Sequence, residues 1–178
     1  YKNPVIFETA WVLPSEYTGP LMDHLNTDQP CRNSKLVQQF VSLFAPSPVS
    51  QEKLMTVVSR KNYNGRKLGR VWLNEDSIVE EMKSKFIDWK IEQVRFELLS
   101  MKEQIQQAQR TRIMIGMHGA GMVHVLWLQE GAKVIEIFPR NKRRWGYRNI
   151  AQYINVEYDD YREGQDGWSL ETKTINKK

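Results

Sequence analysis

The chain has 178 residues, of which 40% are hydrophobic and 26% are charged, a composition typical of a folded globular domain. No apolar run approaches the roughly 20 residues that a membrane-spanning helix needs. The single cysteine, Cys31, excludes an internal disulfide and a zinc site built from cysteines. Because the first residue is Tyr1 rather than methionine, we expect the chain to be an internal part of a longer protein.

The net charge of +5 is concentrated in two segments. Residues 60–70 (RKNYNGRKLGR) and 140–148 (RNKRRWGYR) each contain five Lys or Arg residues and no acidic residue. Such clusters attract nucleic acid, phospholipid or a small phosphorylated ligand, and the alternative is a solvated surface. Both segments follow strand-like runs, where ligands of open α/β sheets bind.

The first 45 residues are predicted to connect this chain to an N-terminal half that it lacks. Residues 4–13 are apolar enough for a strand, and the prolines that follow indicate an irregular connection. The spacing of apolar residues predicts a helix over 34–45, with Ser34 as its N-cap.

From residue 53 onward, predicted strands alternate with predicted helices. Asn74 is the expected N-cap of one helix, and Ser100 with Glu103 forms a capping box for the next. The alternation predicts an α/β, Rossmann-like domain over 46–162, with a mostly parallel sheet covered by helices on both faces, followed by a polar tail over 163–178. The predicted strands are 53–60, 89–97, 112–117, 132–139 and 156–161, and the helices are 74–86, 100–111, 121–130 and 147–155.

The stretch IMIGMHGAGMVHVLWL predicts a strand, a tight glycine turn and a helix. Glycine lets a ligand approach the backbone closely, and the free N–H groups of a helix start bind phosphate. Gly116, Gly119 and Gly121 have the spacing G-x-x-G-x-G, which differs from the dinucleotide fingerprint G-x-G-x-x-G. A purely structural turn is the alternative.

The two histidines near this turn have different expected roles. His118 and His124 are six residues apart and no H-E-x-x-H occurs, which argues against zinc. His118 can hydrogen-bond a phosphate or a reacting oxygen, whereas His124, in an apolar helix, is expected to pack in the core. Serine hydrolysis is disfavoured because the chain has no G-x-S-x-G pentapeptide.

Glu136 is the acid of the apolar strand KVIEIFP, where an unpaired carboxylate would be costly. It is expected either to pair with a basic residue or to accept ribose hydroxyls, and both readings stay open. Arg60 ends the strand over 53–60, and Arg66 and Arg70 follow it with the planar forks that suit a diphosphate. The competing ligand is nucleic acid, for which no recognised motif is present.

Four blocks in order resemble glycosyltransferase family 61, which includes EGF-domain O-linked N-acetylglucosamine transferases, protein O-mannose N-acetylglucosaminyltransferases and plant xylan glycosyltransferases. The resemblance runs from about Lys53 to Tyr161. The blocks are VVSRKNYNGRKLGRVWLNEDSIVEEM, MKEQIQQAQRTRIMIGMHGAGMVHVLWL, GAKVIEIFP and YRNIAQYINVEYDDY.

The resemblance implies the C-terminal, donor-binding half of a GT-B enzyme. Such an enzyme would be inverting, would take a UDP-sugar of the N-acetylglucosamine or xylose type as co-substrate, and would need neither a tightly bound cofactor nor a metal. Its acceptor would be a protein or glycan hydroxyl, and it would act in the ER or Golgi lumen. His118 is the candidate catalytic residue. The implied donor-site residues are Ser59, Arg60, Arg66, Arg70, His118, Gly119, Ala120, Gly121, Met122 and Glu136, with Asn74 and Gln104 as neighbours.

Two alternatives to this function remain. The first is a non-catalytic module of the same fold that binds a nucleotide or another anion. The second is a basic nucleic-acid-binding domain, in which Tyr63 or Trp145 would stack on bases.

Overall fold

The computed structural model describes residues 33–45, 52–62, 68–139, 144–166 and 173–175. The predicted strand over 4–13, the irregular connection after it and Arg66 lie outside the described residues. So does most of the basic run at the start of the 140–148 segment.

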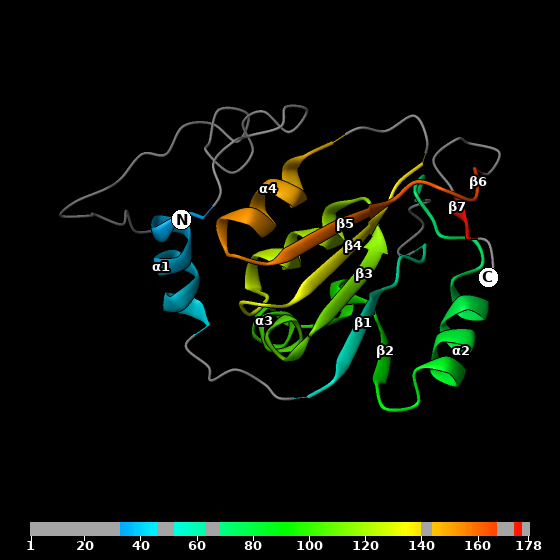
Figure 1. Ribbon diagram of the computed structural model, residues 1–178, viewed down its shortest axis with the longest axis horizontal. Helices are drawn as coiled ribbons and strands as arrows, with labels where there is room; N and C mark the ends of the chain where they lie inside the picture. Colours follow the sequence, from blue (N-terminus) through cyan, green and yellow to red (C-terminus); the bar gives the residue numbers. More distant parts are fainter. Residues whose placement is uncertain (1–32, 46–51, 63–67, 140–143, 167–172, 176–178) are drawn as a thin grey trace, which may run out of the picture.

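The centre of the fold is a five-stranded, entirely parallel sheet with the order β2-β1-β3-β4-β5 (Figure 1). This confirms the predicted α/β, Rossmann-like class and the alternation of strands and helices. All five residues of strand β1 (Leu54–Val58) are buried, as expected where helices cover both faces of a parallel sheet. The strands are β1 (Leu54–Val58), β2 (Lys90–Val94), β3 (Ile113–Met117), β4 (Lys133–Ile137) and β5 (Glu157–Tyr161).

Helices cover both faces of this sheet and enclose one apolar core on each. Figure 1 shows α2 on one side and α3 and α4 on the other. Trp72 and Val79 belong to the core under α2, whereas Ile105 and Ile150 belong to the core of the opposite face. The helices are α1 (Lys35–Phe44), α2 (Glu75–Lys85), α3 (Met101–Arg110) and α4 (Gly146–Tyr153), and the 3-10 segments are η1 (Phe96–Leu98) and η2 (Ala120–Trp127).

All three predicted N-cap positions are confirmed, but only two of the side chains make the capping hydrogen bond. Ser34 accepts the N–H of Val37, and the capping box of Ser100 and Glu103 is complete. Asn74 precedes α2 but makes no side-chain cap. Its carboxamide oxygen instead accepts from the indole N–H of Trp72 at 3.0 Å and from the backbone N–H of Ile175 at 2.9 Å, so a local and a tertiary contact both compete with the cap.

The helix predicted over 121–130 is the 3-10 segment η2, which begins at Ala120 and ends at Trp127. A 3-10 helix is tighter than an α-helix and has poorer hydrogen-bond geometry. Two glycines allow close packing here, because a Cβ on Gly116 of β3 would lie 2.7 Å from the sulfur of Met122 and one on Gly121 of η2 would lie 2.9 Å from Val58. The turn is therefore pressed against β1.

Segments at both ends of the described chain lie against the sheet domain. Helix α1 is joined to α4 by the N–H of Asn33, which donates to the carbonyl of Gln152 at 2.9 Å. The short strands β6 (Gln165–Asp166) and β7 (Lys173–Thr174) pair with each other, and Ile175 packs against the core under α2.

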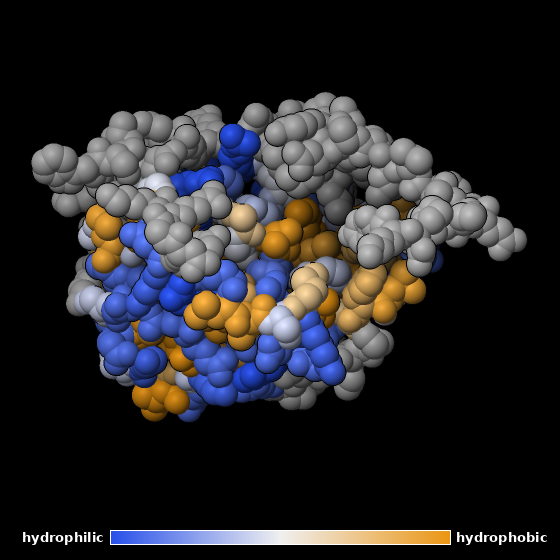
Figure 2. Space-filling view, turned by 180° about the vertical axis from the view of Figure 1, so that it is seen from behind, coloured by the Kyte–Doolittle hydropathy of each residue, from blue (hydrophilic) through white to orange (hydrophobic). Residues whose placement is uncertain are grey.

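The surface is mixed in character. Figure 2 shows a largely hydrophilic face interrupted by separate hydrophobic areas. Leu36 and Leu43 of α1 are 73% and 76% exposed, so part of its apolar surface is not covered by the described residues. Among those residues, no helix has the length and apolar character to cross a membrane.

Candidate functional site

The site lies where β1 and β3 end side by side. From β1 the chain crosses to β2 on one side of the sheet, and from β3 it crosses to β4 on the other, so this edge is the topological switch point. Ser59 and Arg60 follow β1 directly, and residues 118–121 follow β3. Parallel pairing therefore places Arg60, the first residue of the arginine loop (residues 60–70), next to the glycine turn (residues 118–121).

Arg60 is locked onto the glycine turn. Its Nη1 donates to the carbonyl oxygen of His118 at 3.0 Å. A Cβ on Gly119 would lie 1.8 Å from the same Nη1, far inside van der Waals contact. A side chain at position 119 would therefore have to displace the guanidinium from the space that it occupies beside the turn.

The turn offers three backbone N–H groups, fewer than predicted. The N–H groups of Gly119, Ala120 and Gly121 have no acceptor among the described residues. In contrast, the N–H of His118 donates to the carbonyl of Ile137 at 2.8 Å, and that of Met122 donates to Gly119 at 2.9 Å. These two N–H groups are already used within the fold. The three others and the Arg60 guanidinium form an anion-binding arrangement.

Gly119→Ala is expected to weaken pyrophosphate binding about 10-fold or more, because the new methyl group displaces the Arg60 guanidinium and one charge-assisted hydrogen bond is lost. Titration calorimetry with inorganic pyrophosphate measures this change. Gly131→Ala is the matched control: Gly131 has φ +75° and open space around its Cβ position. We expect it to cost about 1 to 2 kcal/mol of unfolding free energy and to leave pyrophosphate affinity unchanged. Equal binding by the Gly119 variant and wild type would contradict the role given to Arg60.

Glu136 lies beneath the glycine turn, where it contacts His118, and it is entirely buried. Its Oε1 lies 2.5 Å from Nδ1 of His118, and its Oε2 accepts from the hydroxyl of Tyr158 at 2.6 Å. Burial and the neighbouring carboxylate raise the pKa of the Tyr158 hydroxyl, which therefore remains a donor. Of the two expectations for Glu136, the structure shows the pairing with a residue of the protein, and that residue is His118. The 0% exposed carboxylate presents no oxygen to a ribose.

Sequence reasoning did not identify Tyr158. It could have been inferred from two facts: a buried carboxylate needs hydrogen-bond donors, and the strand predicted to follow that of Glu136 contains a tyrosine. The register pairs Val134 with Tyr158 and Glu136 with Asp160, so Tyr158 lies two residues along the strand from the partner of Glu136. Only the order of β4 and β5 in the sheet shows that the phenol reaches the carboxylate.

The imidazole of His118 is held by its surroundings. Its ring stacks on Phe138 with centroids 4.7 Å apart, and Tyr147 lies at 5.8 Å. Of the two ring nitrogens, Nδ1 donates a hydrogen bond to the Glu136 carboxylate, so Nε2 is the ring atom left for a ligand, and it has no partner among the described residues.

Tyr147 also shows that Arg70 lies near this site. Burial and the charge of Glu136 raise the pKa of Tyr147 to about 12, and the charges of Arg70 and Arg60 act in the opposite direction. Both arginines are therefore close enough to Tyr147 for their positive charges to act on its hydroxyl.

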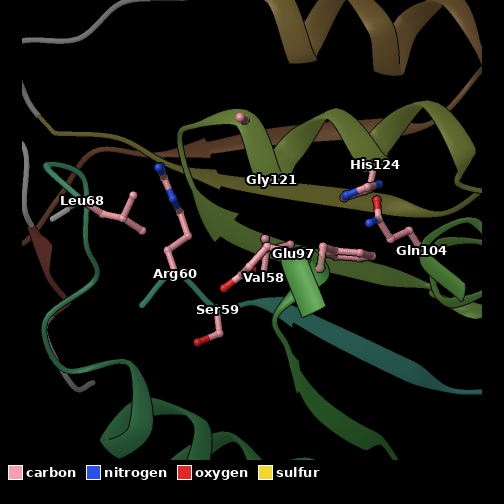
Figure 3. A pocket seen from close by; sticks show the side chains of 10 residues that line it. Val58, Ser59, Arg60, Leu68, Glu97, Gln104, Gly121 and His124 are labelled. Carbon is pink, nitrogen blue, oxygen red and sulfur yellow. The ribbon is translucent and has the colours of Figure 1, made fainter. Parts of the chain in front are cut away.

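A pocket of about 260 Å³ lies beside the turn. It brings together several predicted donor-site residues, and it adds Phe96 and His124, which the sequence analysis did not place there (Figure 3). Met122, also a predicted donor-site residue, is fully buried in the core and does not line the pocket. The described residues that line the pocket are Val58, Ser59, Arg60, Leu68, Phe96, Glu97, Gln104, Ala120, Gly121 and His124.

Two predicted residues point elsewhere. The hydroxyl of Ser59 is buried without a hydrogen-bond partner among the described residues, and Figure 3 shows it directed away from Gly121 and His124. The carboxamide of Asn74 binds the backbone N–H and C=O of Ile175, so it joins α2 to the C-terminal segment. It lines a separate pocket that shares Arg60. Within the described part of the chain, no group of His, Cys, Asp and Glu side chains is arranged to hold a metal ion.

Comparison with known proteins identifies the family. The model of the family described as Glycosyltransferase 61 matches residues 20–135, which include the arginine loop and the glycine turn. The chain belongs to glycosyltransferase family 61. The match ends one residue before Glu136, so Glu136 and Tyr158 lie outside it.

The chain is similar to curated relatives with one common name, EGF domain-specific O-linked N-acetylglucosamine transferase. The relative from Drosophila melanogaster is 29% identical over 136 residues, which are 73% of this chain and 25% of the relative. The one from Xenopus laevis is 26% identical over 160 residues, 83% of this chain and 27% of the relative. That from Mus musculus is 26% identical over 141 residues, 75% of this chain and 26% of the relative. The chain thus spans about a quarter of the length of these relatives.

Proposed function

We propose that this chain is the donor-binding half of a glycosyltransferase that transfers a sugar from a UDP-sugar to a protein or glycan hydroxyl with inversion. The observation that carries the proposal is the Arg60 guanidinium fixed against the glycine turn at the switch point of the sheet. This arrangement supplies a cation and free N–H groups to a diphosphate without requiring a metal ion. Membership of the family and the names of the relatives support the reaction type.

In an inverting transfer, the acceptor oxygen attacks the anomeric carbon while the bond from that carbon to the diphosphate oxygen breaks. The bonding electrons leave with the diphosphate, whose negative charge Arg60 and the N–H groups of the turn stabilise. The acceptor hydroxyl loses its proton to a base. His118 is the candidate catalytic residue of this chain, because Glu136 holds a proton on Nδ1 and leaves Nε2 for exchange with the ligand.

The remaining parts of the enzyme belong to the same proposal. An N-terminal half would complete a GT-B cleft, and the exposed apolar side chains of α1 are the surface that we expect it to contact. The sugar would be of the N-acetylglucosamine or xylose type, and the reaction would take place in the lumen of the ER or Golgi, as the resemblance implies.

Titration calorimetry of the chain with UDP tests the proposal. We expect saturable binding of one UDP that does not depend on added divalent metal, with EDTA as the control. A chain that fails to bind UDP but binds RNA or DNA in a salt-sensitive manner would refute the proposal and favour a nucleic-acid-binding domain. UDP binding without sugar transfer by the longer protein would favour a non-catalytic module.

A further inference from the structure

The pocket beside the glycine turn has two chemically different ends. Figure 3 shows Arg60 and Leu68 at one end, and Gln104 and His124 at the other. Arg60 makes the first end cationic. The carboxylate that lines the pocket, Glu97, is neutralised by Arg95 at 2.7 Å. A ligand that fills both ends therefore has an anionic group at the first and an uncharged polar group at the second.

His124 presents the edge of its ring at the second end. The residue is only 6% exposed, and its Nδ1 is enclosed by protein atoms without a hydrogen-bond partner among the described residues, so Nε2 is the ring nitrogen left for a ligand. Phe96 stacks on the imidazole at 3.9 Å with an angle of 24°, which covers one face of the ring. Burial lowers the pKa of His124 to about 4, so the ring is neutral near pH 7 and has one N–H donor and one nitrogen acceptor.

Gln104 supplies an acceptor at the same end. Its Nε2 donates to the carbonyl of Leu99 at 2.8 Å, which fixes the orientation of the carboxamide. Its Oε1 has no donor among the described residues, and Figure 3 shows the carboxamide turned toward His124. A fixed acceptor thus lies near a ring that can donate.

Building on the proposed donor site, we infer that Gln104 and His124 recognise the imide edge of uracil in the nucleoside diphosphate. The ring N–H of uracil donates to Oε1 of Gln104, and the adjacent carbonyl accepts from the imidazole N–H of His124. Adenine has the opposite pattern, because its ring nitrogen accepts and its amino group donates. The two residues therefore distinguish uracil from adenine, which contacts with the diphosphate alone cannot do.

The test compares UDP, ADP and inorganic pyrophosphate by titration calorimetry with the wild-type chain and two variants. His124→Phe keeps a flat ring beside Phe96 but cannot hydrogen-bond, and Gln104→Met keeps an unbranched side chain without the acceptor. Each variant is expected to lower UDP affinity about 10- to 100-fold, because a buried polar group of the base loses its partner. Pyrophosphate affinity is expected to change less than about twofold. Gln106→Met, on the exposed face of the same helix, is the matched control.

The outcomes separate this inference from the proposed function. UDP affinity equal to that of the wild type in both variants, or an equal loss for UDP and pyrophosphate, would overturn the base contacts. So would wild-type affinity for ADP as high as that for UDP. If the wild type binds pyrophosphate as tightly as UDP, the diphosphate site stands and the uracil site fails. If the wild type binds neither, the proposed function itself fails. Thermal unfolding by circular dichroism shows whether each variant is folded, and Gln104→Met decides the outcome if His124→Phe is not.

Discussion

Replacing Arg60 with alanine is expected to lower the affinity of the chain for UDP by about 100-fold or more. The guanidinium supplies the cation at the end of β1 and bonds to the carbonyl of His118. A bidentate, charge-assisted contact with a diphosphate contributes several times more than a neutral hydrogen bond, so its loss has a large effect on binding. Titration calorimetry of wild type and Arg60→Ala with UDP measures the change.

Two further variants separate geometry from charge. Arg60→Lys keeps the positive charge but cannot form the planar fork, so we expect an affinity between those of wild type and the alanine variant. Arg112→Ala makes the same change in net charge at the opposite edge of the sheet, directly before β3, and should leave UDP affinity within about twofold of wild type. A large loss of affinity in Arg112→Ala would mean that overall charge, rather than the site, governs binding.

Replacing Glu136 with alanine is expected to lower the free energy of unfolding by about 2 to 5 kcal/mol, because His118 and Tyr158 would each lose a buried acceptor and a cavity would remain. Urea unfolding followed by fluorescence measures this loss. Glu136→Gln should restore most of the stability, since the amide oxygen can accept from His118 and its N–H group can donate to the phenol oxygen of Tyr158.

Tyr158→Phe removes one of the two bonds and should cost about 1 to 2 kcal/mol of unfolding free energy. Tyr161→Phe, on the same strand, is its matched control and is expected to change stability by less. If Glu136→Ala is as stable as wild type, the carboxylate does not anchor His118. The tautomer of His118, read from its ring nitrogens by NMR, gives an independent check, because loss of the carboxylate removes the acceptor that keeps the proton on Nδ1.

Local patterns in the sequence were enough to predict the class of the fold. The period of apolar residues within each segment distinguishes strands from helices, and the alternation of the two indicates βαβ units. The capping box at Ser100 and Glu103 lies within one turn of helix, so it too can be read from spacing. The glycine turn and the arginine loop were likewise visible, because residue type alone limits what such segments can do.

Contacts between residues far apart in the chain were decided by the tertiary structure alone. The bond from Arg60 to the turn joins positions 58 residues apart, and those from Glu136 to His118 and Tyr158 join positions 18 and 22 apart. The Asn74 side chain makes no cap because it bonds to the backbone of Ile175, 101 residues away. The sequence by itself determined the elements and the family, whereas strand order and packing determined which side chains meet, because no local spacing specifies a neighbour on another strand.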